Sequence, residues 1–352
     1  MTAIAPATGH HGREGSTKRA SAPVPWRRIA WVTWRQHRTA LAAILLVMAL
    51  AAVALLLTGL PMHEAAARLG PGWQDRTWLG PRVYVSLSVV VLLQLVPALA
   101  GVFLGAPLLA REAENGTSRL AWTQGASRSK WFVAQAAPVV VLLAIAAAGL
   151  ARELSWWMSP LGTGYAPLAA RLIVSPWGFR SSGSWGPELF DLHPLPFAGW
   201  VTMGFSLGVF LGAVIRRTVP TMAATIACYA VLLYETSTSW RMAYLAPLHA
   251  AVPHAQIGPG AGYSYGVPLT SGRGPDRNIL STALGWPDGR LLGNSELRHP
   301  TAWFGQHHIR VWMTYQPASR YYTFQFIEFG WLMALSLLLI AATVILIRRR
   351  AA

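Results

Sequence analysis

The chain has 352 residues, of which 53% are hydrophobic and only 12% are charged, and its formal net charge is +16. Soluble proteins carry about 25% charged residues, so this composition excludes a water-soluble fold of this size. The basic residues lie at the edges of apolar runs and not in one patch, which argues against a nucleic-acid-binding protein.

The first 38 residues precede any long apolar run. Residues 1–25 are polar and rich in Ala, Gly, Pro and Ser, so we expect a disordered cytoplasmic arm. In residues 26–38 the apolar and arginine side chains fall on different sides of a helix, which predicts an amphipathic helix in the headgroup layer. A plain cytoplasmic extension of the first span is the alternative.

Six apolar segments are long enough to cross the hydrocarbon core at a helical rise of about 1.5 Å per residue. They are 39–60, 83–110, 131–150, 196–215, 218–234 and 326–347. The predicted fold is an all-α polytopic membrane protein with six transmembrane helices, an N-terminal interfacial helix and a large extracellular loop before the last span. The first five spans occupy residues 39–234, the extracellular loop region 235–325, and the sixth span with its basic cytoplasmic tail 326–352.

The orientation follows from the Lys and Arg residues beside the spans. With the N-terminus inside, the inner segments hold 16 and the much longer outer segments hold 13 of the 29 basic residues. The positive-inside rule therefore places both termini in the cytoplasm of a bacterial cell.

Small and polar residues within the spans predict helix contacts. Gly204, Gly208 and Gly212 recur every four residues, and Gly101 and Gly105 form a shorter copy, so neighbouring helices can approach closely there. This contact could be a dimer seam or sliding surface, or ordinary packing within one subunit.

Two polar side chains are candidates for a substrate path. Gln94 lies in the middle of a span, where a polar group faces a cavity or makes one interhelical hydrogen bond. Glu328 could bind a cation or a proton, but a carboxylate near a helix N-terminus is also favourable in itself.

Enzymatic and metal motifs are weak. Residues 262–266 match G-x-S-x-G, which would make Ser264 the nucleophile of a membrane-embedded hydrolase, but the motif needs a strand–turn–helix context and lies in a Gly- and Pro-rich loop. The His pairs at 10–11 and 307–308 lack the spacing of a helical zinc site, and Cys228 is the single cysteine. We therefore predict no catalytic residue and no metal site.

A polar segment, residues 111–130, separates the second and third spans. Its Arg and Lys residues suit a solvated inner loop, and a short helix there could present Leu120 and Trp122 to a partner protein.

This segment resembles the first cytoplasmic loop of type-2 permeases, the membrane subunits of ABC exporters, and the last span resembles that of permeases from high-GC Gram-positive bacteria. The family carries an acidic-x-Gly-Thr step, a hydrophobic stretch and a Ser-Arg pair. The matching residues are Glu114, Gly116, Thr117, Leu120, Trp122, Ser127 and Arg128, with Arg111 and Glu112 as the charged lead-in. Gln124-Gly125-Ala126 departs from the usual small-hydrophobic-Pro step.

The resemblance implies that residues 111–130 form a coupling helix seated in a cytoplasmic ATPase. It also implies partners: two copies of an ABC ATP-binding subunit and a second permease subunit, as a homodimer or heterodimer, in membrane lipid and without nucleic acid. The chain has no phosphate-binding loop, so it is expected not to be an enzyme, and ATP and Mg are expected in the partner. The expected cargo is multidrug or lipid-like. The alternative is a non-transporting membrane sensor or assembly protein that uses the extracellular loop.

Overall fold

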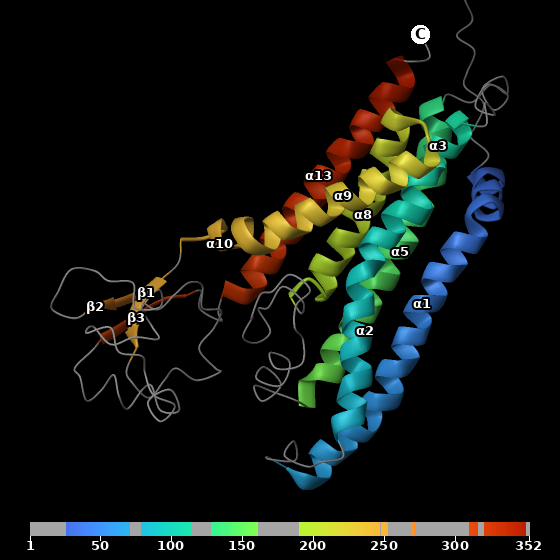
Figure 1. The fold of residues 1–352 in the computed structure, drawn as a ribbon. Helices are drawn as coiled ribbons and strands as arrows, with labels where there is room; N and C mark the ends of the chain where they lie inside the picture. Colours follow the sequence, from blue (N-terminus) through green and yellow to red (C-terminus); the bar gives the residue numbers. More distant parts are fainter. Residues whose placement is uncertain are drawn as a thin grey trace, which may run out of the picture.

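The computed structural model describes residues 26–70, 79–114, 128–160, 190–246, 248–252, 269–271, 310–315 and 320–349. Among these residues, six helices are long and apolar enough to cross a membrane, and they form one bundle (Figure 1). The predicted all-α membrane fold with six spans is confirmed. The helices are α1 (Trp26–Leu69), the consecutive α2 (Leu79–Ala100), η2 (Gly101–Gly105) and α3 (Ala106–Glu114), then α5 (Arg128–Met158), α8 (Pro194–Ile215), α9 (Thr218–Glu235) and α13 (Tyr321–Arg349).

The helix ends differ from the predicted bounds. Helix α1 has 44 residues and runs from Trp26 into the first span without a break, as in the alternative of a plain extension of that span. The position of residues 26–38 in the headgroup layer stays a prediction. The second span is interrupted by the π-helical turn η2, which begins four residues after Pro97. The arm predicted for residues 1–25 lies outside the described residues.

The region after α9 contains structure that the sequence analysis did not predict. Helix α9 continues into the π-helical turn η4 (Thr236–Trp240) and the short α10 (Arg241–Ala243). Three strands follow: β1 (Leu248–Val252), β2 (Leu269–Ser271) and β3 (Arg310–Tyr315). They form an antiparallel sheet in the order β1-β3-β2, with Leu248 opposite Tyr315 and Leu269 opposite Trp312. The predicted loop region 235–325 thus carries a small sheet.

Helix α8 lies at the centre of the bundle. It begins with a proline at its first turn, where the missing N–H costs no hydrogen bond. Within its span 72% of the residues are buried, against 28% for α1 and 17% for α13. It packs against α2, η2, α3, α5, α9 and α13. The spanning helices other than α1 are therefore arranged around α8, and α1 packs against α5, α2 and η2.

The predicted glycine stripe forms the closest helix contact of the described bundle. A Cβ atom on Gly204 would meet the carbonyl oxygen of Pro97, and one on Gly208 would meet that of Gly101. A Cβ on Gly212 would lie 2.7 Å from the carbonyl oxygen of Ala106. These contacts join α8 to α2, η2 and α3 backbone to backbone, so this glycine face is used within one chain.

The outer faces of the helices are apolar. Leu57, Val219 and Leu337 are 68%, 73% and 65% exposed, and similar side chains cover the rest of the bundle. Monomers in water do not present such large continuous apolar surfaces, whereas lipid tails accept them. The multi-pass membrane assignment follows from both the length of the helices and this surface.

The substitution Gly208→Ala tests the close contact. An added methyl group would collide with backbone atoms of Gly101, and overpacking of this kind costs about 1–3 kcal/mol. Gly149→Ala in α5 is the matched control, because its Cβ meets nothing within 4 Å. We expect thermal unfolding in detergent to show a lower melting temperature for Gly208→Ala alone, and equal melting of the two variants would contradict the packing.

Candidate functional site

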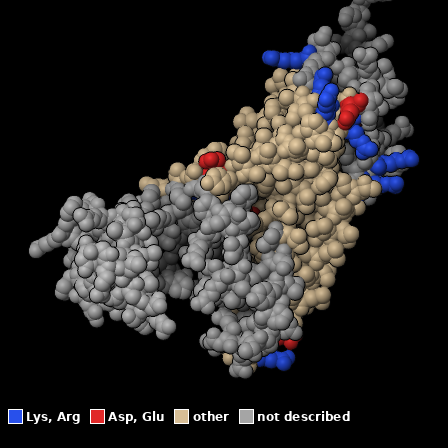
Figure 2. Space-filling model, viewed as in Figure 1, with Lys and Arg blue, Asp and Glu red and all other residues tan. Residues whose placement is uncertain are grey.

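Basic side chains gather at one end of the bundle (Figure 2). We call this the basic end; its exposed members among the described residues include Arg38, Arg111, Lys130, Arg217 and Arg348. Arg348 of α13 donates a hydrogen bond to the hydroxyl of Ser129 on α5 at 3.4 Å. The last turn of α3 and the first turn of α5 both lie at this end.

The predicted coupling segment is described only at its two borders. Arg111, Glu112 and Glu114 belong to the last turns of α3, and Arg128 begins α5. Arg111 and Glu114 are exposed, and Glu112 is half-buried. The remaining predicted coupling residues lie outside the described residues: Gly116, Thr117, Leu120, Trp122 and Ser127.

Glu114 caps a helix that is distant in sequence. Its Oε2 accepts hydrogen bonds from the hydroxyl of Thr218 at 2.6 Å and from the backbone N–H of Thr218 at 3.2 Å. The first N–H groups of a helix have no partner inside the helix, and the N-cap residue Arg217 makes no side-chain cap bond. A carboxylate of α3 therefore fills the capping position of α9.

The turn between α8 and α9 is short and conformationally demanding. It consists of Arg216 and Arg217, and Arg216 has φ of 61°, in the left-handed region that non-glycine residues rarely adopt. Its N–H closes α8 by donating to the carbonyl of Gly212 at 3.1 Å. The Glu114 carboxylate thus bonds to the first residue after a tightly constrained turn.

A buried ion cluster lies toward the opposite end of the bundle. Arg241 Nε donates to Glu328 Oε2 at 2.9 Å, and its Nη2 donates to Glu328 Oε1 at 2.8 Å. The same Nη2 also donates to Asp191. Both Arg241 and Glu328 are fully buried. We call Asp191, Arg241 and Glu328 the ion cluster; it joins the segment before α8 to α10 and α13.

Aromatic donors complete the shell of the ion cluster. Trp200 Nε1 donates to Glu328 Oε1 at 3.0 Å, and the Tyr244 hydroxyl donates to Oε2 at 3.2 Å. The guanidinium of Arg241 also lies over the Phe190 ring, 4.2 Å from its centroid. A buried ion pair is tolerated only when such extra bonds replace water, and these contacts supply several of them.

Two titratable groups before α8 are affected by this burial. Burial and the nearby Glu328 carboxylate raise the pKa of Asp191, and the positive charge of Arg241 opposes that rise. Burial lowers the pKa of His193 to about 4, so its ring is neutral at physiological pH. Arg241 therefore supplies the positive charge between the two carboxylates.

The two predicted substrate-path residues lie apart. Helix α13 begins at Tyr321, so Glu328 is in its second turn, beyond the first turn where the helix dipole acts most strongly. Its carboxylate is bonded to Arg241, and its interaction partners on α8 and α10 were not identified from sequence. Gln94 is half-buried on α2.

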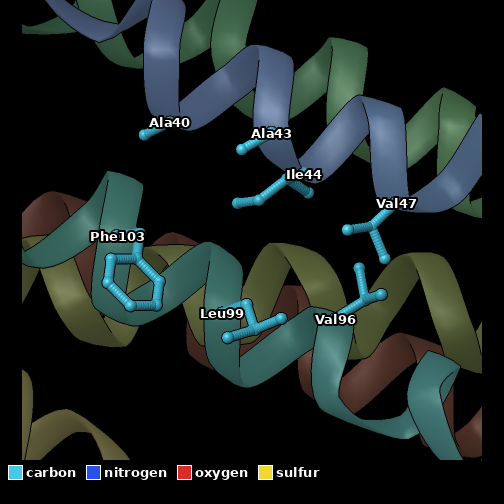
Figure 3. A pocket seen from close by; sticks show the side chains of 7 residues that line it. All are labelled: Ala40, Ala43, Ile44, Val47, Val96, Leu99 and Phe103. Carbon is cyan, nitrogen blue, oxygen red and sulfur yellow. The ribbon is translucent and has the colours of Figure 1, made fainter.

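An apolar groove of about 250 Å³ separates α1 from α2 and η2 (Figure 3). Ala40, Ala43, Ile44 and Val47 of α1 face Val96, Leu99 and Phe103 across it. Neither Gln94 nor Glu328 lines this groove. Among the described residues no group of three or more His, Cys, Asp and Glu could hold a metal ion.

A protein-family model described as ABC-2 membrane transporter related matches residues 44–241, more than half of the chain. The chain belongs to this family. It is thus an ABC-2 type membrane permease subunit, and the family works with an ABC ATPase subunit. The matched residues include both borders of the 111–130 loop, the glycine contact and Arg241. Comparisons with curated proteins and with solved structures gave no significant match.

Removal of Arg241 tests the ion cluster. Arg241→Met leaves two carboxylates without their cation, and breaking a buried pair costs about 3–5 kcal/mol. Glu328→Gln keeps the bond from Arg241 to Asp191, so a smaller loss is expected. The control is Glu64→Gln in the exposed pair with Arg68, 3.6 Å apart, because such pairs contribute about 0–1 kcal/mol.

The measurement is the melting temperature of each purified variant in detergent. We expect Glu64→Gln to melt close to the unmodified protein. The melting temperature of Glu328→Gln should be lower, and that of Arg241→Met should be the lowest. If Arg241→Met melted together with the Glu64 variant, the ion cluster would have no stabilising role.

Proposed function

We propose that the chain is the transmembrane subunit of an ATP-driven exporter, with the basic end in the cytoplasm and the 111–130 loop in contact with a separate ATPase. The family match and the position of α3 and α5 support this proposal. The observation that carries it is that the 111–130 loop leaves and re-enters the bundle at the basic end. The positive-inside rule orients that end toward the cytoplasm, where an ATPase is available.

ATP and Mg belong to the partner in this proposal. The sequence has no G-x-x-x-x-G-K-[ST] loop to cradle phosphates, so the free energy of hydrolysis has to enter through a contact between chains. Two ATPase copies and a second permease subunit would complete the exporter. Because the glycine face of α8 is occupied within the chain, the second permease would pack against another face.

The proposed cargo is amphipathic or lipid-like. The buried charges of the ion cluster are bonded to one another, and the groove between α1 and α2 is entirely apolar. Membrane-spanning helices with these features offer an apolar surface to a ligand. Such a surface suits a molecule that partitions into lipid.

The proposed ATPase contact is tested by the double substitution Leu120→Ala and Trp122→Ala. A buried interface tryptophan contributes about 2 kcal/mol or more, so affinity for the ATPase should fall by a factor of about 30. The control is Tyr322→Ala, an aromatic residue that is 71% exposed at the opposite end of the bundle.

The assay is binding of the native-membrane ATPase to the chain in nanodiscs, followed by its ATP hydrolysis rate. Binding that is unaffected by the double substitution would remove the loop as the ATPase contact. A chain that recruits no ATPase in the unmodified form would favour the sensor or assembly alternative.

A further inference from the structure

Helix α9 contacts the bundle along a narrow line. Its buried side chains are Thr221, Thr225 and Tyr229, which follow one another at four-residue spacing. Both threonine hydroxyls donate to carbonyls of the preceding turn of the same chain segment, at 2.7 Å each. Only 17% of the α9 span is buried, against 72% for α8. Side-chain packing along the length of α9 is therefore limited, and contacts at its two ends contribute more to its position.

The end of α9 at the basic end is bonded to α3. The glycine contact fixes α3 to α8 as far as Ala110, which lies beside Gly212. The last turn of α3 extends beyond that contact, and Glu114 at its end bonds to Thr218. Pro220 removes one of the other first-turn N–H groups of α9, so the N–H of Thr218 is one of few donors available there.

The other end of α9 leads to the ion cluster. The helical path continues from α9 through η4 into α10, because the cap residues Thr236 and Arg241 both have right-handed helical angles. Arg241 then bonds to Glu328 and Asp191. One continuous helical path thus connects Thr218 at the basic end with Arg241 toward the opposite end.

We propose that Glu114 and Thr218 form the joint that passes movement of the 111–130 loop to α9, and that α9 carries this movement to the ion cluster. The inference rests on the proposed function, since it assumes that an ATPase moves the loop. Glu114 is the last residue of α3 and lies within the 111–130 segment, so a displacement of the residues that follow it acts on it first. Its carboxylate is bonded within the chain, which makes Glu114 and Thr218 positioning residues.

The test separates movement of α9 from binding of the ATPase. Cys228 is the single cysteine of the chain and lies exposed on α9, so a spin label there reports on α9 alone. The labelled chain is reassembled with its ATPase in nanodiscs, and spectra are recorded without nucleotide and with Mg-ATP and vanadate. ATP hydrolysis is measured on the same complexes.

Thr218→Val removes the hydroxyl donor and retains the side-chain shape. Only the 3.2 Å bond from the backbone N–H then remains, so we expect the nucleotide-dependent spectral change to shrink and ATP hydrolysis to fall about tenfold, the scale of one hydrogen bond to a carboxylate. Thr218→Ser keeps the donor and should restore both within about twofold. Glu114→Ala removes the acceptor of both bonds and should lose the spectral change.

Two control variants match these substitutions. Thr343→Val removes a hydroxyl that donates to the carbonyl of Leu339 in its own helix, and Glu64→Ala removes an exposed acid on α1. Both should behave as the unmodified chain. ATPase bound at unchanged stoichiometry shows that a variant is folded. If Thr218→Val does not fold, Glu114→Ala provides the test.

The outcomes distinguish this inference from the proposed function. If the unmodified complex responds to Mg-ATP and vanadate and both Thr218→Val and Glu114→Ala respond equally, the joint is overturned and the exporter proposal stands. If the unmodified chain binds no ATPase, the proposed function fails and the joint fails with it.

Discussion

Backbone contact between α8 and the α2–η2–α3 helix is the constraint on which the rest of the bundle depends. Lipid supplies no hydrophobic force between helices, so close van der Waals packing has to hold them together. Glycines on both sides allow carbonyl groups to approach where any Cβ would collide. The π-helical turn η2 lies within this contact, next to Gly204 and Gly208. The remaining helices pack around the pair that this contact fixes.

Hydrogen bonds and ion pairs hold α9 where its apolar packing is limited. Charges within a membrane are costly unless they are bonded, and Arg241 meets this condition through Glu328 and Asp191. At the basic end, Glu114 bonds to Thr218. Helix α9 is therefore bonded to α3 at one end and, through Arg241, to the segment before α8 and to α13 at the other.

The sequence predicts the elements of this fold better than its polar contacts. Span length and apolar content predict six helices, and four-residue spacing brings Gly204 and Gly208 to one face. The bonds of Arg241 to Glu328 and of Glu114 to Thr218 join residues 87 and 104 positions apart, and no periodic pattern marks such pairs. In the sequence Glu328 stands out only as an acid beside a span, because its cation lies after a different helix. The family match confirms the resemblance to type-2 permeases that residues 111–130 carry.

The proposed contact between residues 111–130 of this permease and an ATPase at the basic end can be tested by photo-crosslinking. A photo-crosslinking amino acid is placed at Trp122 in one variant and at Tyr322 in another, and native membranes are irradiated. We expect the Trp122 variant to crosslink to an ATP-binding subunit and the Tyr322 variant not to. Crosslinks to that subunit from Tyr322, with none from Trp122, would contradict both the orientation and the coupling role.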